Sequence, residues 1–501
     1  MNPFKRSLFS VFSNFVKAIF SLATGLLIAR GLGPYDYGIL TFLLASFTSL
    51  GSLLDIGTSS AFYSFISKKK QPKSLFILYL IWLTFQFLIL LLFINILAPE
   101  SWVESIWQGE NKERIIIAFV AVFLQQKIWG MLSQIGESQR ETVFIQSINL
   151  INAMIHLIII FILFYFNILV IEKIFMIIII EFLFISLTTF YFLKIEYSLE
   201  EKTTKQIIEE YRVFCQPLLL YTLIALGMNF FDTWLLQKFG GSIEQAYYGV
   251  GYRFSAISLL ATQSIINVLW KEVSESNELN DKARVLRIYS KSSRTIFISA
   301  LWFSCLFIPW SSEIIQLTLG VDYLGGSSVL AVMFLLPIYQ SLGQLNSTIY
   351  YGLELTKPHA IMGVIFMLIS IITVYFLISP SDLFIPGLGL GSIGLAIKMV
   401  SMQVIAVIFS TWWLSKNQGW YFSIKYQIVG FPCFFISGMI SKKIAYLIFY
   451  NETISLSYLT FSFLMYLIFT SSTIYLMPWL INLTKKEINS YIVAMKRMIK
   501  T

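Results

Sequence analysis

The sequence predicts an all-α fold class, a polytopic membrane helix bundle. Hydrophobic residues make up 57% of the 501 residues and charged residues only 13%, with a mean hydropathy of +0.75. Soluble proteins average about 25% charged residues. Apolar segments of about 18 or more residues, long enough to cross a hydrocarbon core of roughly 30 Å, recur along the whole chain. The sequence lacks the alternating ten-residue segments of a membrane β-barrel.

Fourteen segments meet this length and apolarity, and we expect each to form one spanning helix. The first follows Lys5 and Arg6 like a signal sequence, but it carries Lys17 and lacks a small-residue cleavage pattern. We therefore expect an uncleaved first helix. The predicted spans are approximately 8–30, 38–67, 75–98, 115–135, 143–165, 174–193, 213–237, 246–270, 295–318, 328–353, 359–379, 389–414, 426–449 and 455–481.

The placement of basic residues predicts the topology. With a cytoplasmic N-terminus, 25 of the 36 Lys and Arg residues fall in cytoplasmic segments and seven in or beside periplasmic ones. This bias is the positive-inside rule, so both termini are predicted to be cytoplasmic. The net charge of +9 is therefore explained by topology, and no nucleic-acid partner is expected.

The segments between the spans are too short to form folded domains. The longest, 196–212 and 271–294, have the mixed charge of short solvated helices. The tail after the last span has an apolar face opposite basic residues, which predicts a helix lying on anionic membrane lipids. Three widely spaced cysteines without a CxxC motif indicate neither disulfides nor a metal site, and no cofactor is expected.

Two turns of similar sequence indicate an internal repeat. Each has a basic residue, a glycine three positions later, a polar turn and an aromatic-glycine pair that begins the next helix. A second pair, Gly136 and Gly352, lies at a similar offset, each glycine followed by a basic residue four or five positions later. The first pair of turns contains Arg30, Gly33, Pro34, Tyr37 and Gly38 in one copy and Lys238, Gly241, Tyr248 and Gly249 in the other.

The repeat predicts two six-helix lobes of the same orientation, related by an axis along the membrane normal, plus two C-terminal helices. The predicted parts are an N-terminal lobe (1–194), a cytoplasmic linker (195–212), a C-terminal lobe (213–415), two additional spans (416–482) and a basic amphipathic tail (483–501).

The stretches "IARGLGPYDYGILTF" and "LLDIGTSSAF" resemble the polysaccharide flippases of the multidrug/oligosaccharidyl-lipid/polysaccharide exporter superfamily. Members of that family move undecaprenyl-diphosphate-linked oligosaccharides, for O-antigen or capsule, to the outer leaflet of the bacterial cytoplasmic membrane. The resemblance implies alternating access of two lobes, with spans 1, 2, 7 and 8 lining a central cavity. It also implies a lipid-linked oligosaccharide as substrate, with a polysaccharide polymerase and chain-length machinery as partners.

Ionisable groups inside spans are costly and usually face a cavity or a partner, so they are the candidate site. By helical rise, Lys17 and Asp55 lie at depths where they would meet, as do Asp232 and Arg253. In one interpretation these are structural ion pairs. In the other, Lys17 and Arg253 bind the lipid diphosphate in succession. The further cavity candidates are Lys398, Gln263 and Asn267, and the predicted gate turns contain Gly33, Pro34, Gly38, Gly241 and Gly249.

Other intramembrane groups are assigned lesser roles. Lys127 and Lys398 have no evident partner in the sequence and would either snorkel, pair structurally or bind substrate. His156 and His359 are isolated in apolar surroundings, which is more typical of packing residues than of a proton relay.

Two other functions remain open from the sequence. A drug or small-cation antiporter of the same superfamily would use an intramembrane carboxylate such as Asp55 or Asp232. A membrane glycan polymerase or O-acyltransferase would show a large basic external loop or a catalytic histidine in a polar setting. The longest external segment, about 99–114, has no such cluster, and no nucleophile-base pair is visible, so no catalytic residues are predicted.

Overall fold

The computed structural model describes residues 3–198, 203–279, 281–420, 423–449 and 456–487. Within these ranges the side chains of 3–8, 218, 220–221, 226, 257–268, 270–271 and 456 are not described. The described part of the chain contains helices and no strand, which confirms the all-α prediction. Most of the predicted basic tail lies outside the described residues.

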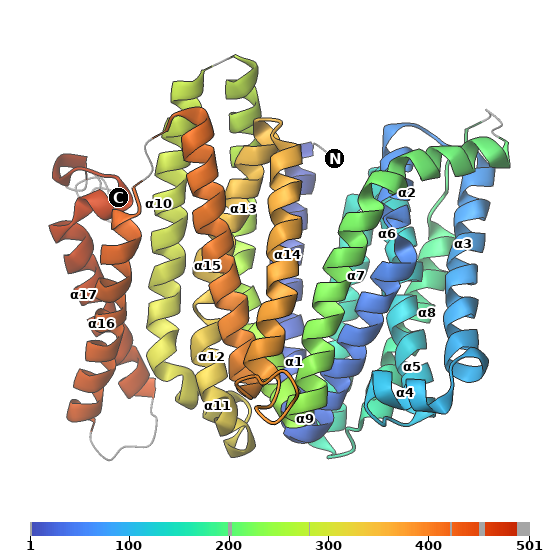
Figure 1. Ribbon diagram of the computed structural model, residues 1–501, viewed down its shortest axis with the longest axis horizontal. Coiled ribbons are helices and arrows are strands. Elements are labelled where there is room, and N and C mark those ends of the chain that lie inside the picture. Colours follow the sequence, from blue (N-terminus) through green and yellow to red (C-terminus); the bar gives the residue numbers. More distant parts are fainter. Residues whose placement is uncertain (1–2, 199–202, 280, 421–422, 450–455, 488–501) are drawn as a thin grey trace. The chain divides into compact units, whose positions relative to one another are not determined.

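Helices account for nearly all of the described backbone (Figure 1). In chain order they are α1 (Pro3–Asp55), α2 (Thr58–Lys68), α3 (Lys73–Leu92), the π-helix η1 (Phe93–Leu97), α4 (Glu100–Trp107), α5 (Lys112–Phe123), the π-helix η2 (Leu124–Ile128), α6 (Trp129–Ser138), α7 (Thr142–Tyr165), α8 (Ile171–Phe192), α9 (Thr204–Glu278), α10 (Lys282–Phe307), the 3₁₀-helix η3 (Ile308–Trp310), α11 (Ser311–Thr318), the 3₁₀-helix η4 (Val321–Gly326), α12 (Ser327–Met333), α13 (Leu336–Gly352), α14 (Thr356–Ile378), α15 (Gly391–Gln418), α16 (Lys425–Ile448), α17 (Leu456–Leu476) and the 3₁₀-helix η5 (Pro478–Ile481).

The chain is a multi-pass membrane protein. Among the described residues, eleven helices are long and apolar enough to cross a membrane, and α9 contributes a further bent pair. The 53 residues of α1 would extend for about 80 Å, well over twice the thickness of a hydrocarbon core of roughly 30 Å. The predicted count of fourteen spans stays a prediction.

Glycine kinks divide the two longest helices at the predicted turns. Gly33 in α1 has φ 74° and ψ 171°, and Gly241 in α9 has φ 77° and ψ −177°. Backbone of this kind is essentially restricted to glycine. Pro34 follows Gly33 directly and begins the second arm of α1, a position where proline is favoured because its missing N–H is not needed. The two turns therefore match in conformation as well as in sequence.

The arms that follow the two kinks cross in close contact. A Cβ atom on Gly38 would lie 1.7 Å from the backbone oxygen of Ser242, so only glycine fits at this crossing. A Cβ atom on Gly249 would lie 3.3 Å from Cγ2 of Thr41. The predicted gate glycines thus differ in their requirements: Gly33 and Gly241 need a left-handed φ, and Gly38 needs space.

The described chain forms two compact units. The first comprises residues 1–249 and 367–392, and the second comprises 250–366 and 393–501. In the first unit α1 packs along α7 and α5, α5 packs on α8, and α2 packs on α6. In the second unit α10 packs on α13 and α16 around a core of Phe297, Leu301, Ile338, Phe434 and Tyr466. The lobe boundaries predicted from the repeat are not tested by these units.

Candidate functional site

A break between α1 and α2 places a carboxylate inside the first unit. The chain leaves α1 at Asp55, passes through Ile56 (φ 48°) and Gly57 (φ 82°), and begins α2 at Thr58. A left-handed φ is strained for a β-branched residue such as Ile56, and strain of this kind persists where the surrounding structure enforces it. The break turns the Asp55 side chain toward the positive N-terminal end of α2.

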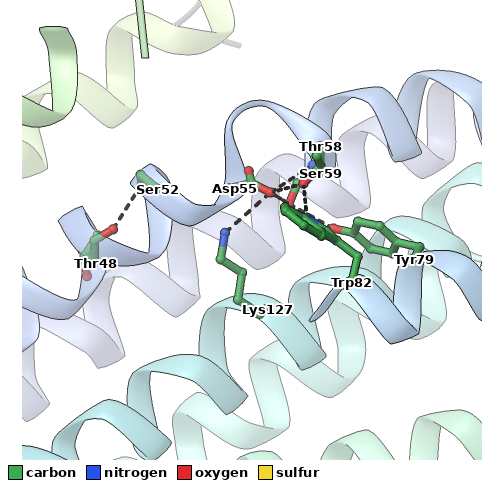
Figure 2. Close-up of polar contacts among 8 residues, drawn as sticks. All are labelled: Thr48, Ser52, Asp55, Thr58, Ser59, Tyr79, Trp82 and Lys127. Atoms are coloured by element: carbon green, nitrogen blue, oxygen red, sulfur yellow. Dashed lines mark hydrogen bonds and ion pairs between the residues drawn. The ribbon is translucent and has the colours of Figure 1, made fainter. Parts of the chain in front are cut away.

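One carboxylate oxygen of Asp55 accepts three hydrogen bonds from the start of α2. Oδ1 accepts from the Thr58 hydroxyl at 2.7 Å, from the Ser59 hydroxyl at 2.8 Å and from the Ser59 backbone N–H at 3.0 Å. Two aromatic side chains of α3 extend this network, as Figure 2 shows. The Trp82 indole N–H donates to Thr58 Oγ1 at 3.0 Å, and the Tyr79 hydroxyl lies 2.9 Å from that of Ser59. The carboxylate is therefore fixed by both α2 and α3.

The cation that faces Asp55 is Lys127. Its Nζ lies 3.6 Å from Asp55 Oδ1, and the two side chains are only 11% and 16% exposed. Lys127 extends from η2, a π-helical turn, and such turns are frequent at functional sites. Charge-assisted hydrogen bonds are shorter, about 2.7–2.9 Å. The ammonium is therefore attracted to the carboxylate without being bonded tightly to it, and its N–H donors remain available to an anion.

An exposed row of polar groups continues from this pair along α1. Thr48 and Ser52 are exposed, and each hydroxyl donates to the carbonyl four residues earlier. The Gln126 amide, from the same π turn as Lys127, donates to Thr48 Oγ1 at 2.8 Å. These polar side chains form a surface that joins α1 to η2.

An apolar cavity adjoins the charged cluster. Its volume is about 580 Å³. Thr58, Tyr79 and Trp82 line it on the side of the cluster. The rest of the lining is mostly apolar or aromatic, with Arg212 as its charged member. A charged pair and an apolar cavity therefore share a wall within one unit.

The structure corrects the predicted partner of Asp55. Among the described residues Lys17 makes no ion pair, and Asp55 faces Lys127 instead. The sequence had assigned Lys127 no partner. The sequence marks Lys127 only by the polar run "QQK" in an apolar span. Helical spacing does not reveal the π turn that directs Lys127 toward Asp55.

The other predicted site residues are dispersed. Asp232 is buried in the first unit, whereas Arg253 is half-buried in the second, so their predicted contact stays a prediction. Lys398 is buried in α15 of the second unit. The side chains of Gln263 and Asn267 lie outside the described residues.

Comparisons with known proteins bear on the fold alone. No protein-family model matches the sequence, and no curated protein sequence matches it. A solved structure described as the lipid II flippase MurJ in an inward closed conformation is similar with a TM-score of 0.67 and 19% identity, covering 93% of this chain and 98% of that one.

Two transporters of the MOP superfamily are also similar. An inward-facing multidrug resistance MATE family transporter has a TM-score of 0.59 and 16% identity, covering 80% of this chain and 96% of that one. A transporter from Pyrococcus furiosus has a TM-score of 0.54 and 16% identity, covering 82% and 94%. The chain therefore has the fold of these transporters.

Proposed function

We propose that this protein flips undecaprenyl-diphosphate-linked oligosaccharides across the bacterial cytoplasmic membrane by alternating access. The observation that carries the proposal is the shared wall between the Asp55–Lys127 pair and the apolar cavity of 580 Å³. A lipid-linked substrate has two corresponding parts, an anionic diphosphate for the charged pair and a hydrocarbon chain for the cavity. The cation would contact the first and the cavity would take part of the second.

The extent of the structural similarity supports a lipid substrate. The structure described as a lipid II flippase aligns with 93% of this chain, whereas the MATE transporter aligns with 80%. Counting the arms of α1 and of α9 as separate spans would give the fourteen spans expected from the sequence. In this proposal Lys17, Arg253 and Lys398 supply further cationic contacts for the substrate.

The glycine turns supply the outer gate of the proposed transporter. The arms that start at Gly33 and Gly241 cross at Gly38 and Ser242 with no room for a side chain. Such a contact would close the path on one side, and its separation would open it. Both termini would be cytoplasmic, the polymerase and chain-length machinery would receive the exported unit, and the protein would not act as an enzyme.

A multidrug or cation antiporter is the second candidate function. The observation that favours it is the Asp55 carboxylate, since only one of its oxygens accepts the three hydrogen bonds from α2. A cationic drug would contact Asp55 and compete with Lys127, whereas a lipid diphosphate would contact Lys127 and compete with Asp55.

The two candidates are separated by transport in proteoliposomes. Purified protein is reconstituted with a fluorescent undecaprenyl-diphosphate oligosaccharide, and flipping is followed by the loss of the label to an impermeant quencher. Uptake of a fluorescent cationic dye is measured in parallel. We expect flipping of the lipid and no uptake of the dye. Dye uptake without lipid flipping would contradict the proposal and establish the antiporter.

A further inference from the structure

A second ionisable pair lies within the membrane-spanning part of the first unit. His156 on α7 and Glu181 on α8 approach each other with 2.8 Å between Nδ1 and Oε2. Glu181 is the eleventh of the 22 residues of α8, about 15 Å from either end of the helix. It is therefore near the centre of a hydrocarbon core of roughly 30 Å, where an ionisable side chain is costly and usually functional.

The contact geometry requires at least one proton on the pair. A hydrogen bond of 2.8 Å requires one proton between Nδ1 and Oε2. With that proton alone the pair carries one negative charge, and Glu181 Oε1 is buried without a hydrogen-bond partner among the described residues. A second proton makes the pair neutral, as a carboxylic acid with neutral imidazole or as a carboxylate with imidazolium.

None of the charged groups described within the neighbouring spans forms an ion pair with Glu181. Lys127 on η2 pairs with Asp55 on α1, and Glu137 on α6 accepts a hydrogen bond from Gln146. Lys17 on α1 makes no ion pair among the described residues.

The remaining charged groups on the helices packed against the pair are near helix ends or the α1 kink. Arg114, in the first turn of α5, bonds to Glu110 and Glu172. Lys112 and Glu113 are in the first turn of α5, and Glu172 and Lys173 are in the first turn of α8. Arg30 and Asp36 flank the Gly33 turn. No described ion pair joins any of these groups to Glu181, so a proton is the cation left to neutralise it.

The two side chains differ in access. Glu181 is 7% exposed and His156 is 20% exposed, so the imidazole is the accessible member. Imidazole accepts a proton at Nε2 and releases one from Nδ1, which makes it a relay toward the carboxylate. A proton that binds Nε2 would move the shared proton from Nδ1 to Oε2, and the charge of the pair would change from −1 to zero with no other bond made or broken.

We infer that His156 and Glu181 form the binding site of a transported proton. The inference rests on the proposed function, because it gives that transporter its coupling ion. α8, which carries Glu181, packs against η2, which carries Lys127. Loss of the negative charge at Glu181 changes the electrostatic potential at the neighbouring Asp55–Lys127 pair. Proton binding and substrate binding are thereby linked within one unit.

The first test measures proton binding without any transport. Infrared difference spectra of the purified protein in nanodiscs are recorded between alkaline and acidic pH for the wild type and Glu181→Gln. Glu172→Gln is the matched control, since Glu172 is in the first turn of the same helix and pairs with Arg114. We expect a protonated-carboxyl band in the wild type and the control that is lost in Glu181→Gln. Identical spectra for all three proteins would overturn the inference.

The second test measures coupling in proteoliposomes with an imposed pH gradient. We expect the gradient to accelerate flipping by the wild type and by Glu172→Gln, and this acceleration to be lost in Glu181→Gln and His156→Gln. Retained acceleration in Glu181→Gln, or flipping by the wild type that ignores the gradient, would overturn the inference. A wild type that does not flip the lipid at all would instead refute the proposed function and leave the infrared result to decide whether the pair binds a proton.

Discussion

Replacement of Gly33 by alanine isolates the backbone strain at the first turn. The residue has φ 74° and ψ 171°, a region essentially closed to other residues, where strain costs about 1–3 kcal/mol. A Cβ atom at Gly33 would meet no other atom within 4 Å, so no clash adds to this cost. We therefore expect Gly33→Ala to lower the free energy of unfolding by about 1–3 kcal/mol.

The assay is denaturant unfolding of the purified protein in detergent, with Gly130→Ala as the matched control. Gly130 lies within α6 at a φ that is not positive, and a Cβ atom there would also meet nothing within 4 Å. Because alanine is a better helix former than glycine, Gly130→Ala should raise the free energy of unfolding by about 0.5–1 kcal/mol. Gly33→Ala should also impair glycan export while the protein remains in the membrane. Equal stability of Gly33→Ala and Gly130→Ala would refute the argument from backbone strain.

Two further predictions concern topology and Arg253. Single cysteines placed in 68–73 or 282–294, on a background without native cysteines, should resist an impermeant maleimide in intact cells, whereas a cysteine in 101–112 should react. Labelling at 68–73 would overturn the assigned orientation. If Arg253 binds the diphosphate, Arg253→Ala should abolish export without loss of protein from the membrane, and Arg253→Lys should retain part of it, because the charge remains but the planar fork is lost. Recovery of export and abundance in a double Arg253→Ala and Asp232→Ala variant would instead indicate a structural pair.

The fold class can be predicted from the sequence because it depends on the length and apolarity of individual segments. Long apolar segments dictate membrane helices, and the repeated glycine turn predicted two positions that share one unusual backbone conformation. The distinction between Gly33, which needs its φ, and Gly38, which needs space against Ser242, required coordinates. The sequence alone does not show whether a glycine is required for its backbone conformation or for its small size.

The pairing of Asp55 could not be read from helical spacing. Rise per residue gives the depth of a side chain but not the direction in which it points around the bundle, so Lys17 and Lys127 were both available. The π turn at Leu124–Ile128 changes that direction for Lys127. The His156–Glu181 pair has a sequence signal, since Glu181 is the charged residue in the middle of an apolar span, but the sequence does not show that His156 on the preceding span faces it.

The most direct test of the proposed function is the flipping rate of Lys127 variants in proteoliposomes. Lys112→Ala is the matched control, since its ammonium binds the backbone oxygen of Asn95 outside the site. At 3.6 Å and an effective dielectric constant of about 20, the Coulomb attraction between Lys127 and Asp55 is about 4.6 kcal/mol before desolvation. The membrane abundance and the free energy of unfolding of each variant are therefore measured together with its flipping rate. Lys127→Ala is combined with Asp55→Ala, because Lys127→Ala alone would leave the Asp55 carboxylate buried without its cation.

If Lys127 contacts the diphosphate, the Lys127→Ala and Asp55→Ala double variant should be folded and unable to flip the lipid-linked oligosaccharide, while Lys127→Arg and Lys112→Ala should remain active. A folded double variant that flips the lipid at the wild-type rate would contradict the proposed role of Lys127 in substrate binding.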